Sequence, residues 1–300
     1  MNETTVPHRR GFSVTANRKA KKSISLSLLI FKTRTSSNNL ISQTSSSGVN
    51  NMLIKRYFRH LYSRTMKKAY DCAYGEIVNT LSGGGECLDC GAHQGQHFYY
   101  LQQRIQLEME CYHGIEWNNK SAIIARNKGL HIQAGNLNKP LPYESNRFQC
   151  VFALSVLEHL LNGCQWIRES KRVLQPGGCL VILTPNISTF FTIALLMAGK
   201  MPSSGPHPDS QALLMGEAPL QVSDMGSPDV ESDTPVHRHL VVFSYRVLKK
   251  YLELVGFENV RGYGFGLYPF PNFLQLVLEK FDPYHCHQMV FVATKSLSDE

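Results

Sequence analysis

The sequence predicts an α/β fold in which helices cover both faces of a mostly parallel sheet. Two observations predict it. From residue 86 onward, short apolar runs of strand length alternate with stretches of helical periodicity, and a repeated strand-then-helix order produces parallel strands. A hydrophobic content of 43% is also enough to form one buried core in a domain of about 200 to 250 residues. Seven strands are expected, at 86–92, 109–117, 131–137, 148–160, 178–186, 258–265 and 288–295.

Helices are expected before and between these strands. One or two lead-in helices are predicted over 53–81, where apolar residues recur at helical spacing up to three consecutive glycines. The region 200–236 breaks the alternation with six acidic residues, one lysine and frequent proline, so it is interpreted as a loop or lid. The remaining helices are expected at 93–105, 121–129, 164–174 and 237–257, the last of them stopping at Gly256.

Charge is divided unevenly along the chain. The formal net charge is +8, yet residues 1–68 hold 14 basic residues and one acid, whereas residues 69–300 hold 17 basic residues against 22 acids. The part predicted to fold is therefore mildly acidic. Because a folded domain that binds nucleic acid needs a basic surface, we expect no nucleic-acid partner.

Residues 1–51 are interpreted as a disordered basic leader, because they are rich in serine, threonine and asparagine and show no sustained period. Three explanations stay open: an organelle transit peptide, a simple tail, or translation that begins at Met52. The domain proper is expected to span 52–300.

Cysteine and apolar patterning bear on location. Eight cysteines lie mostly inside apolar runs, which is typical of reduced, buried thiols and favours a cytoplasmic protein, unless the leader directs import into an organelle. No apolar run reaches the roughly 18 to 20 residues of a membrane-spanning helix. The apolar segments 187–199 and 267–281 allow at most peripheral membrane contact and slightly favour a hydrophobic, lipid-like substrate.

A glycine-containing turn follows the first strand. It contains Asp89, Gly91, Ala92 and Gly95, and such a turn at a helix N-terminus lets backbone approach a ligand closely. Glu116 ends the next strand, where an acid can accept hydrogen bonds from both ribose hydroxyls of a nucleoside. The spacing is not that of a dinucleotide fingerprint, which disfavours an NAD-dependent oxidoreductase, and the chain has no P-loop.

Four blocks in order resemble the class I S-adenosylmethionine-dependent methyltransferases, in particular their type 11 and type 23 groups. These blocks are ECLDCGAHQG, GIEWNN, FQCVFALSVLEHL and RVLQPGGCLVILTPN, and HLVVFS before the last helix is similar to the C-terminal segment of the same groups. The resemblance runs from about 85 to 295. It implies a Rossmann-like, seven-stranded, mostly parallel sheet whose last strand is antiparallel, and S-adenosyl-L-methionine as cofactor.

The resemblance also implies a set of cofactor-binding residues. Asp89, Gly91 and Ala92 would lie under the methionine moiety, and Gly95 would let the helix pack closely. Glu116 would hold the ribose, and Trp117 would lie against the adenine. Asn136 stands where the family often has an acid. The implied set is completed by Leu137, Leu154 and Ser155. Two departures are His93 in place of a glycine and Gln149 in place of the usual acid.

Catalytic and metal-binding residues are less well marked by the sequence. His159, just beyond the fourth strand, is the first candidate for a general base, and His239, beyond the lid, is the second. The alternative for His159 is a helix-capping histidine. Cys87 and Cys90 have no second pair at zinc spacing, so no metal is expected.

The sequence thus predicts a methyltransferase that acts on a small-molecule acceptor, lipid-like or sugar. A catalytically silent methyltransferase-like binding module is the alternative, prompted by His93 and Gln149. The chemical identity of the acceptor and the oligomeric state stay open.

Overall fold

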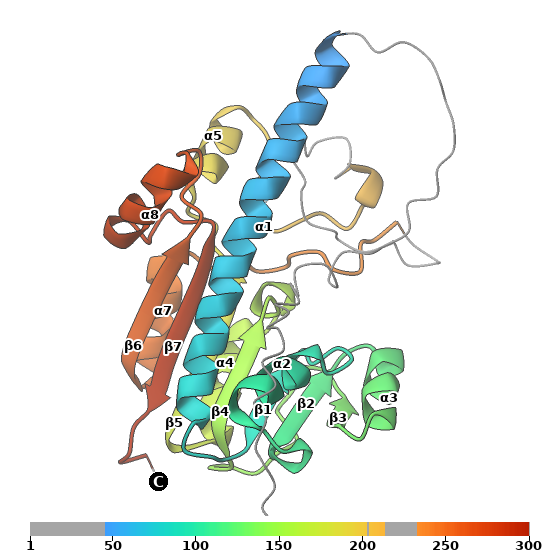
Figure 1. Ribbon diagram of the computed structural model, residues 1–300, viewed down its shortest axis with the longest axis vertical. Helices are drawn as coiled ribbons and strands as arrows, with labels where there is room; N and C mark the ends of the chain where they lie inside the picture. Colours follow the sequence, from blue (N-terminus) through green and yellow to red (C-terminus); the bar gives the residue numbers. More distant parts are fainter. Residues whose placement is uncertain (1–45, 203, 214–232, 300) are drawn as a thin grey trace, which may run out of the picture. The chain divides into compact units, whose positions relative to one another are not determined.

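The computed structural model describes residues 46–202, 204–213 and 233–299 (Figure 1). The predicted leader lies outside these residues, except that its last six residues belong to the first helix. The predicted lid is described only over 200–202, 204–213 and 233–236.

The sheet has seven strands in the order β3-β2-β1-β4-β5-β7-β6. Strand β7 runs antiparallel to both of its neighbours, while the pairs among β1 to β5 are parallel. The prediction of a mostly parallel sheet with an antiparallel last strand is confirmed. The strands are β1 (Cys87–Cys90), β2 (Tyr112–Glu116), β3 (His131–Ala134), β4 (Phe148–Leu154), β5 (Leu174–Pro185), β6 (Phe257–Phe265) and β7 (Gln288–Lys295).

Alternation along the strands divides the core into two layers. In β4, Val151 and Ala153 face one layer while Cys150 and Phe152 face the other, because successive side chains of a strand point to opposite faces. All four are fully buried. Both faces of the central strands are therefore covered, which explains why the sequence shows continuous apolar runs there.

One face is covered by α1 (Ser46–Leu81), α2 (Gln96–Ile105) and α3 (Asn119–Asn127). Helix α1 is a single helix where one or two were predicted, and it contacts β4, β5 and β7 (Figure 1). Its buried positions Ala69, Ala73 and Ile77 recur every four residues and are fully buried. The small side chains of Ala69 and Ala73 let α1 approach the sheet closely.

The other face is covered by α4 (Gly163–Val173) and α7 (Tyr245–Val255). The predicted helix 237–257 is wrong over its first eight residues, which are not helical. The helix begins after Ser244, whose side chain accepts a hydrogen bond from the backbone N–H of Val247, and it ends at Gly256 in the left-handed conformation. The apolar run 240–243 imitates a helical period but precedes this N-cap.

A long excursion of the chain leaves the sheet after β5 and returns before α7. Its two ends are joined, because Ile187 N–H donates to the Phe243 carbonyl at 3.2 Å. Asn186 strengthens the junction: its Nδ2 donates to the carbonyls of Tyr284 and Cys286, and its Oδ1 accepts from Tyr245 N–H. The helix α5 (Phe190–Met197) lies within the excursion, and α8 (Asn272–Phe281) lies between β6 and β7.

No helix in the part of the chain that the structure describes is long and apolar enough to cross a membrane. All eight cysteines are free thiols.

Candidate functional site

The turn between β1 and α2 adopts a backbone that favours glycine. Gly91 and Gly95 have φ of 91° and 82°, and His93 between them has φ of 46°. The left-handed φ of Gly95 favours glycine, and a Cβ there would lie 2.1 Å from Leu130 Cδ1, so the buried Leu130 side chain would have to move. The interpretation of Gly95 as a close helix contact is consistent with this geometry. Ala92 is buried, and its N–H donates to the Ile115 carbonyl.

Asp89 lies fully buried at the end of β1. Its Oδ2 accepts hydrogen bonds from the Tyr112 hydroxyl and from His97 Nδ1. Burial lowers the pKa of His97, but the charge of Asp89 and this hydrogen bond outweigh it, and the net shift is upward. The other oxygen, Oδ1, is buried and has no hydrogen-bond partner among the described residues. A buried acceptor of this kind is available to a ligand donor.

Glu116 ends β2 and joins two loops of the site. Its Oε2 accepts from His93 N–H and its Oε1 from Asn118 N–H, both at 2.8 Å. These contacts hold the carboxylate against the turn after β1, and they leave lone pairs free on each oxygen because a carboxylate offers about four acceptor sites. Trp117 beside it is 73% exposed, so its indole has no covering in this structure.

The remaining predicted cofactor residues lie at the ends of neighbouring strands. Asn136 follows β3, and its Oδ1 accepts from Asn138 N–H at 2.9 Å. Leu137 and Leu154 are buried. Ser155 has φ of 59°, and its Oγ lies 3.5 Å from the Tyr70 hydroxyl of α1. Because parallel strands end at one edge of a sheet, the turns after β1 to β4 all open at the same edge.

The turn after β4 carries the acceptor-side candidates. Glu158 is buried; its Oε2 accepts from the Thr184 hydroxyl at 3.0 Å, and burial raises the pKa of its carboxyl group. His159 follows it, and its Nδ1 lies 2.9 Å from the Arg238 carbonyl. A carbonyl only accepts, so Nδ1 carries the proton and Nε2 keeps its lone pair.

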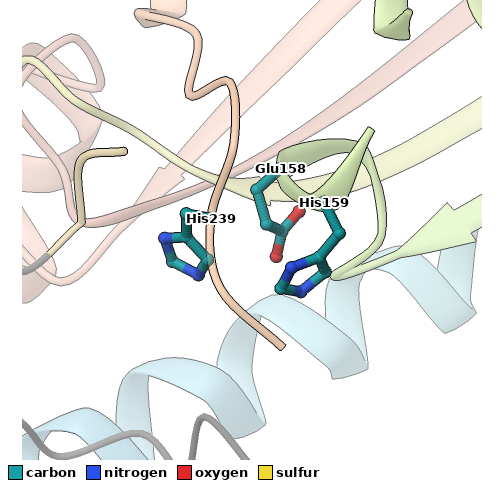
Figure 2. Close-up of side chains that lie close together, drawn as sticks. All are labelled: Glu158, His159 and His239. Carbon is teal, nitrogen blue, oxygen red and sulfur yellow. The ribbon is translucent and has the colours of Figure 1, made fainter. Parts of the chain in front are cut away.

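The last residues of the excursion bring His239 to this turn. The backbone N–H of Leu240 donates to the Glu158 carbonyl at 2.7 Å, and the rings of His159 and His239 lie 5.4 Å apart. Figure 2 shows the Glu158 carboxylate between the two rings. Burial, with the neighbouring His159 and His207, lowers the pKa of His239 to about 3, so its ring is neutral at pH 7. The two predicted catalytic histidines therefore lie together.

Several residues of this edge were not predicted. Three such residues are Tyr70 of α1, His97 of α2 and Tyr112 of β2. All three lie outside the four sequence blocks, and none is a glycine or an acidic residue at a strand end. Only the second histidine in the run His93-Gln94-Gly95-Gln96-His97 offered a signal, since it lies one helical turn from the glycine turn.

A family model described as a methyltransferase domain matches residues 59–261, more than half of the chain. The chain belongs to this family. The resemblance seen in the four sequence blocks is confirmed: this is a class I S-adenosylmethionine-dependent methyltransferase fold, with its glycine turn, Glu116 and the Leu157–His159 turn all inside the matched range.

One curated relative matches part of this methyltransferase. It is described as a probable S-adenosylmethionine-dependent methyltransferase of Mycolicibacterium smegmatis and is 39% identical over 66 residues. The match covers 22% of this chain and only 25% of the relative's own length.

Solved structures of methyltransferases are also similar. A protein of Thermotoga maritima, described as a possible histamine N-methyltransferase, is 15% identical, covers 82% of this chain and 99% of its own, and has a TM-score of 0.45. Phosphoethanolamine N-methyltransferase 2 of Haemonchus contortus, solved with S-adenosyl-L-methionine, is 14% identical over 71% of this chain and 49% of its own, also at a TM-score of 0.45. At this level of identity the likeness to the two proteins is one of fold and does not extend to their substrates.

The cofactor that the family implies fits the residues present. The buried Oδ1 of Asp89 lacks a donor among the described residues, and the Glu116 carboxylate keeps lone pairs at the mouth of the same turn. A ligand with an ammonium group and two ribose hydroxyls supplies donors for both carboxylates.

Proposed function

We propose that this protein transfers a methyl group from S-adenosyl-L-methionine to a small-molecule acceptor. The observation that carries the proposal is the meeting of Asp89, Gly91 and Glu116 at one sheet edge within the range that the family model matches. When bound, the cofactor supplies a methyl group already activated by a positively charged sulfur.

The cofactor half of the site has a defined part for each predicted residue. Glu116 accepts hydrogen bonds from the ribose hydroxyls through its free lone pairs, and Asp89 accepts from the amino group through Oδ1. Asn136 accepts from the adenine amino group through the second lone pair of its amide oxygen. Leu137, Leu154 and Trp117 provide apolar contacts to the cofactor. The backbone of Gly91, Ala92, Gly95 and Ser155 forms the turns that border it.

The acceptor half lies on the other side of Ser155. Methyl transfer depends on alignment of the acceptor and exclusion of water, and Tyr70 of α1 covers this side of the turn. An acceptor hydroxyl must also lose a proton. In a metal-free site His159 takes it at Nε2, since the Arg238 carbonyl holds Nδ1–H in place; the neutral His239 ring lies beside it.

Exposed apolar side chains on α5 and α8 support an acceptor with an apolar body. On α5, Ile193 and Leu196 are 44% and 57% exposed, and on α8, Phe273 is 71% exposed. The Phe190 ring, which opens α5, stacks on His285 at 4.5 Å, close to the start of β7. These surfaces favour a lipid-like acceptor and peripheral contact with a membrane over a sugar. The cytoplasmic location predicted from the cysteines stays a prediction.

Titration calorimetry with S-adenosylhomocysteine tests the cofactor half. We expect binding by the wild type, at least about tenfold weaker binding by Glu116→Gln because a neutral amide replaces a charged acceptor, and wild-type affinity for Glu110→Gln. Glu110 is exposed and lies before β2, so it controls for the loss of one negative charge. A wild type that binds nothing at millimolar ligand would refute the proposal.

A silent binding module is the second candidate, because His93 occupies a family glycine position and its N–H is already bonded to Glu116. The His93 side chain is exposed and leaves the turn uncovered. Transfer of label from methyl-labelled cofactor to a lipid or metabolite extract separates the candidates: a silent module binds S-adenosylhomocysteine and transfers no label.

A further inference from the structure

Glu158, His159 and His239 place three metal-binding atoms close together. One donor atom from each side chain lies within 4.8 Å of the other two. Glu158 and His159 come from the turn after β4, whereas His239 is 80 residues beyond His159 and lies near the end of the excursion (Figure 2). No part of the proposed cofactor contacts uses any of the three.

We propose that these three side chains bind one divalent first-row transition-metal ion, with zinc as the best match. Two imidazoles and one carboxylate are a common ligand set for such ions, whereas magnesium and calcium prefer oxygen ligands alone. Ligand atoms around a tetrahedral zinc lie roughly 3.3 Å apart. The cluster must therefore contract by at most about 1.5 Å, and the segment that carries His239 is not part of a helix or strand.

The groups around the three ligands are those that metal ligands ordinarily have. His159 donates Nδ1–H to the Arg238 carbonyl, which fixes the tautomer with Nε2 free to coordinate. Thr184 donates to Glu158 Oε2 and orients the carboxylate. His239 Nδ1 is buried and has no hydrogen-bond partner in the described part of the chain, so this nitrogen is available to a metal ion.

The charge of the cluster points the same way. Glu158 is 3% exposed, and among the described residues the side-chain donor to it is the neutral hydroxyl of Thr184. A buried carboxylate is costly unless a positive group accompanies it, and a divalent cation between Glu158 and two imidazoles supplies that charge.

His207 stands next to this set but is not counted as a ligand. Its ring lies 4.8 Å from the His239 ring, and its Nδ1 accepts from His239 N–H at 3.2 Å. It instead positions the backbone of the third ligand.

Three protein ligands leave an open position, which is typical of catalytic rather than structural sites. The cluster follows Ser155 on the acceptor side, so the open position would take an oxygen of the acceptor, and a metal-bound hydroxyl would release its proton to solvent water more readily than a free one. In the metal-bound form His159 is then a ligand and not the base. This last step rests on the proposed methyl transfer, whereas metal binding itself does not.

The test uses the full chain without an affinity tag, stripped with EDTA and kept reduced. Zinc titration should show one high-affinity site per chain in the wild type, at least about 100-fold weaker in Glu158→Gln and in His239→Gln. His131→Gln is the matched control: His131 is an exposed histidine on the edge strand β3, which β2 and β1 separate from β4 in the sheet order, and should bind as the wild type does.

Cobalt replaces zinc in a second measurement, because the eight free cysteines also bind zinc. We expect visible absorption of a four- or five-coordinate cobalt without thiolate charge-transfer bands. Thiolate bands, or no high-affinity site in the wild type, would overturn the proposal whether or not the variants fold. Wild-type binding of S-adenosylhomocysteine, measured with and without zinc, keeps this failure separate from failure of the proposed function.

Discussion

His287 makes stability depend on pH in a way that can be calculated. Its ring is buried between Tyr62 and Tyr268, with Ser204 Oγ 3.3 Å from Nδ1 and His239 as the nearby titratable group. Burial lowers the pKa of His287 from 6.5 to about 4. Below pH 6.5 the unfolded chain therefore binds a proton at this residue while the folded chain does not, so stability falls as the pH falls.

The size of the effect follows from these two pKa values. At pH 5 the unfolded state gains about 2 kcal/mol relative to the folded state, and at pH 8 it gains nothing. For a chain of this length, that corresponds to about 4 to 8 °C in Tm. Replacement by glutamine removes the titrating group but keeps a polar side chain, so His287→Gln should lose about 2 kcal/mol less than the wild type between pH 8 and pH 5.

Thermal melting at pH 8, 6 and 5 in EDTA measures the difference. His287→Gln is expected to be less stable at pH 8, because it leaves a gap in the core, yet its Tm should fall less on acidification. His131→Gln, at an exposed position, should keep the wild-type slope. Parallel slopes for the wild type and His287→Gln would refute the reasoning.

Two further predictions concern the turn after β1. Gly95→Ala places a Cβ 2.1 Å from Leu130 Cδ1 in a left-handed backbone, so the free energy of unfolding measured with urea should fall by roughly 2 kcal/mol or more. Gly83→Ala, with open space around the new Cβ, should lower it by less than half as much. Equal losses of stability in the two variants would contradict this reasoning. His97→Gln removes a residue whose pKa is raised by Asp89. The stabilisation it gives is complete below about pH 6.5 and is lost as the pH rises through the folded pKa, so urea midpoints of the variant should gain less than those of the wild type from pH 8 to pH 6. An equal gain would show that the pair contributes nothing.

The sheet could be predicted because its signal is local. Each central strand is an apolar run of the right length, and alternation places Val151 and Phe152 on opposite faces whatever the rest of the chain does. The start of α7 could not be read from periodicity alone, since the apolar residues before Ser244 pack against the core from an irregular segment. The N-cap at Ser244 was the better signal.

The candidate site divides in the same way. Asp89 and Glu116 stand at strand ends, so topology alone brings them to one edge. The grouping of His239 with Glu158 has no such local cause. It depends on where the last residues of the excursion lie, and no spacing rule links His159 and His239 across 80 residues. This is why no metal site was predicted from the sequence.

The closed junction at Ile187 and Phe243 has a consequence for how this enzyme can change. Because the excursion begins and ends at hydrogen-bonded neighbours, with Asn186 fixing both sides, its length and composition are decoupled from the register of the sheet. Insertion, deletion or exchange of the chain between these two residues would thus change the proposed acceptor half. The proposed cofactor half, built on earlier strands, would be inherited unaltered. A chimera that grafts a foreign 188–242 segment onto this frame would replace His239 as well, and so would test both proposals at once.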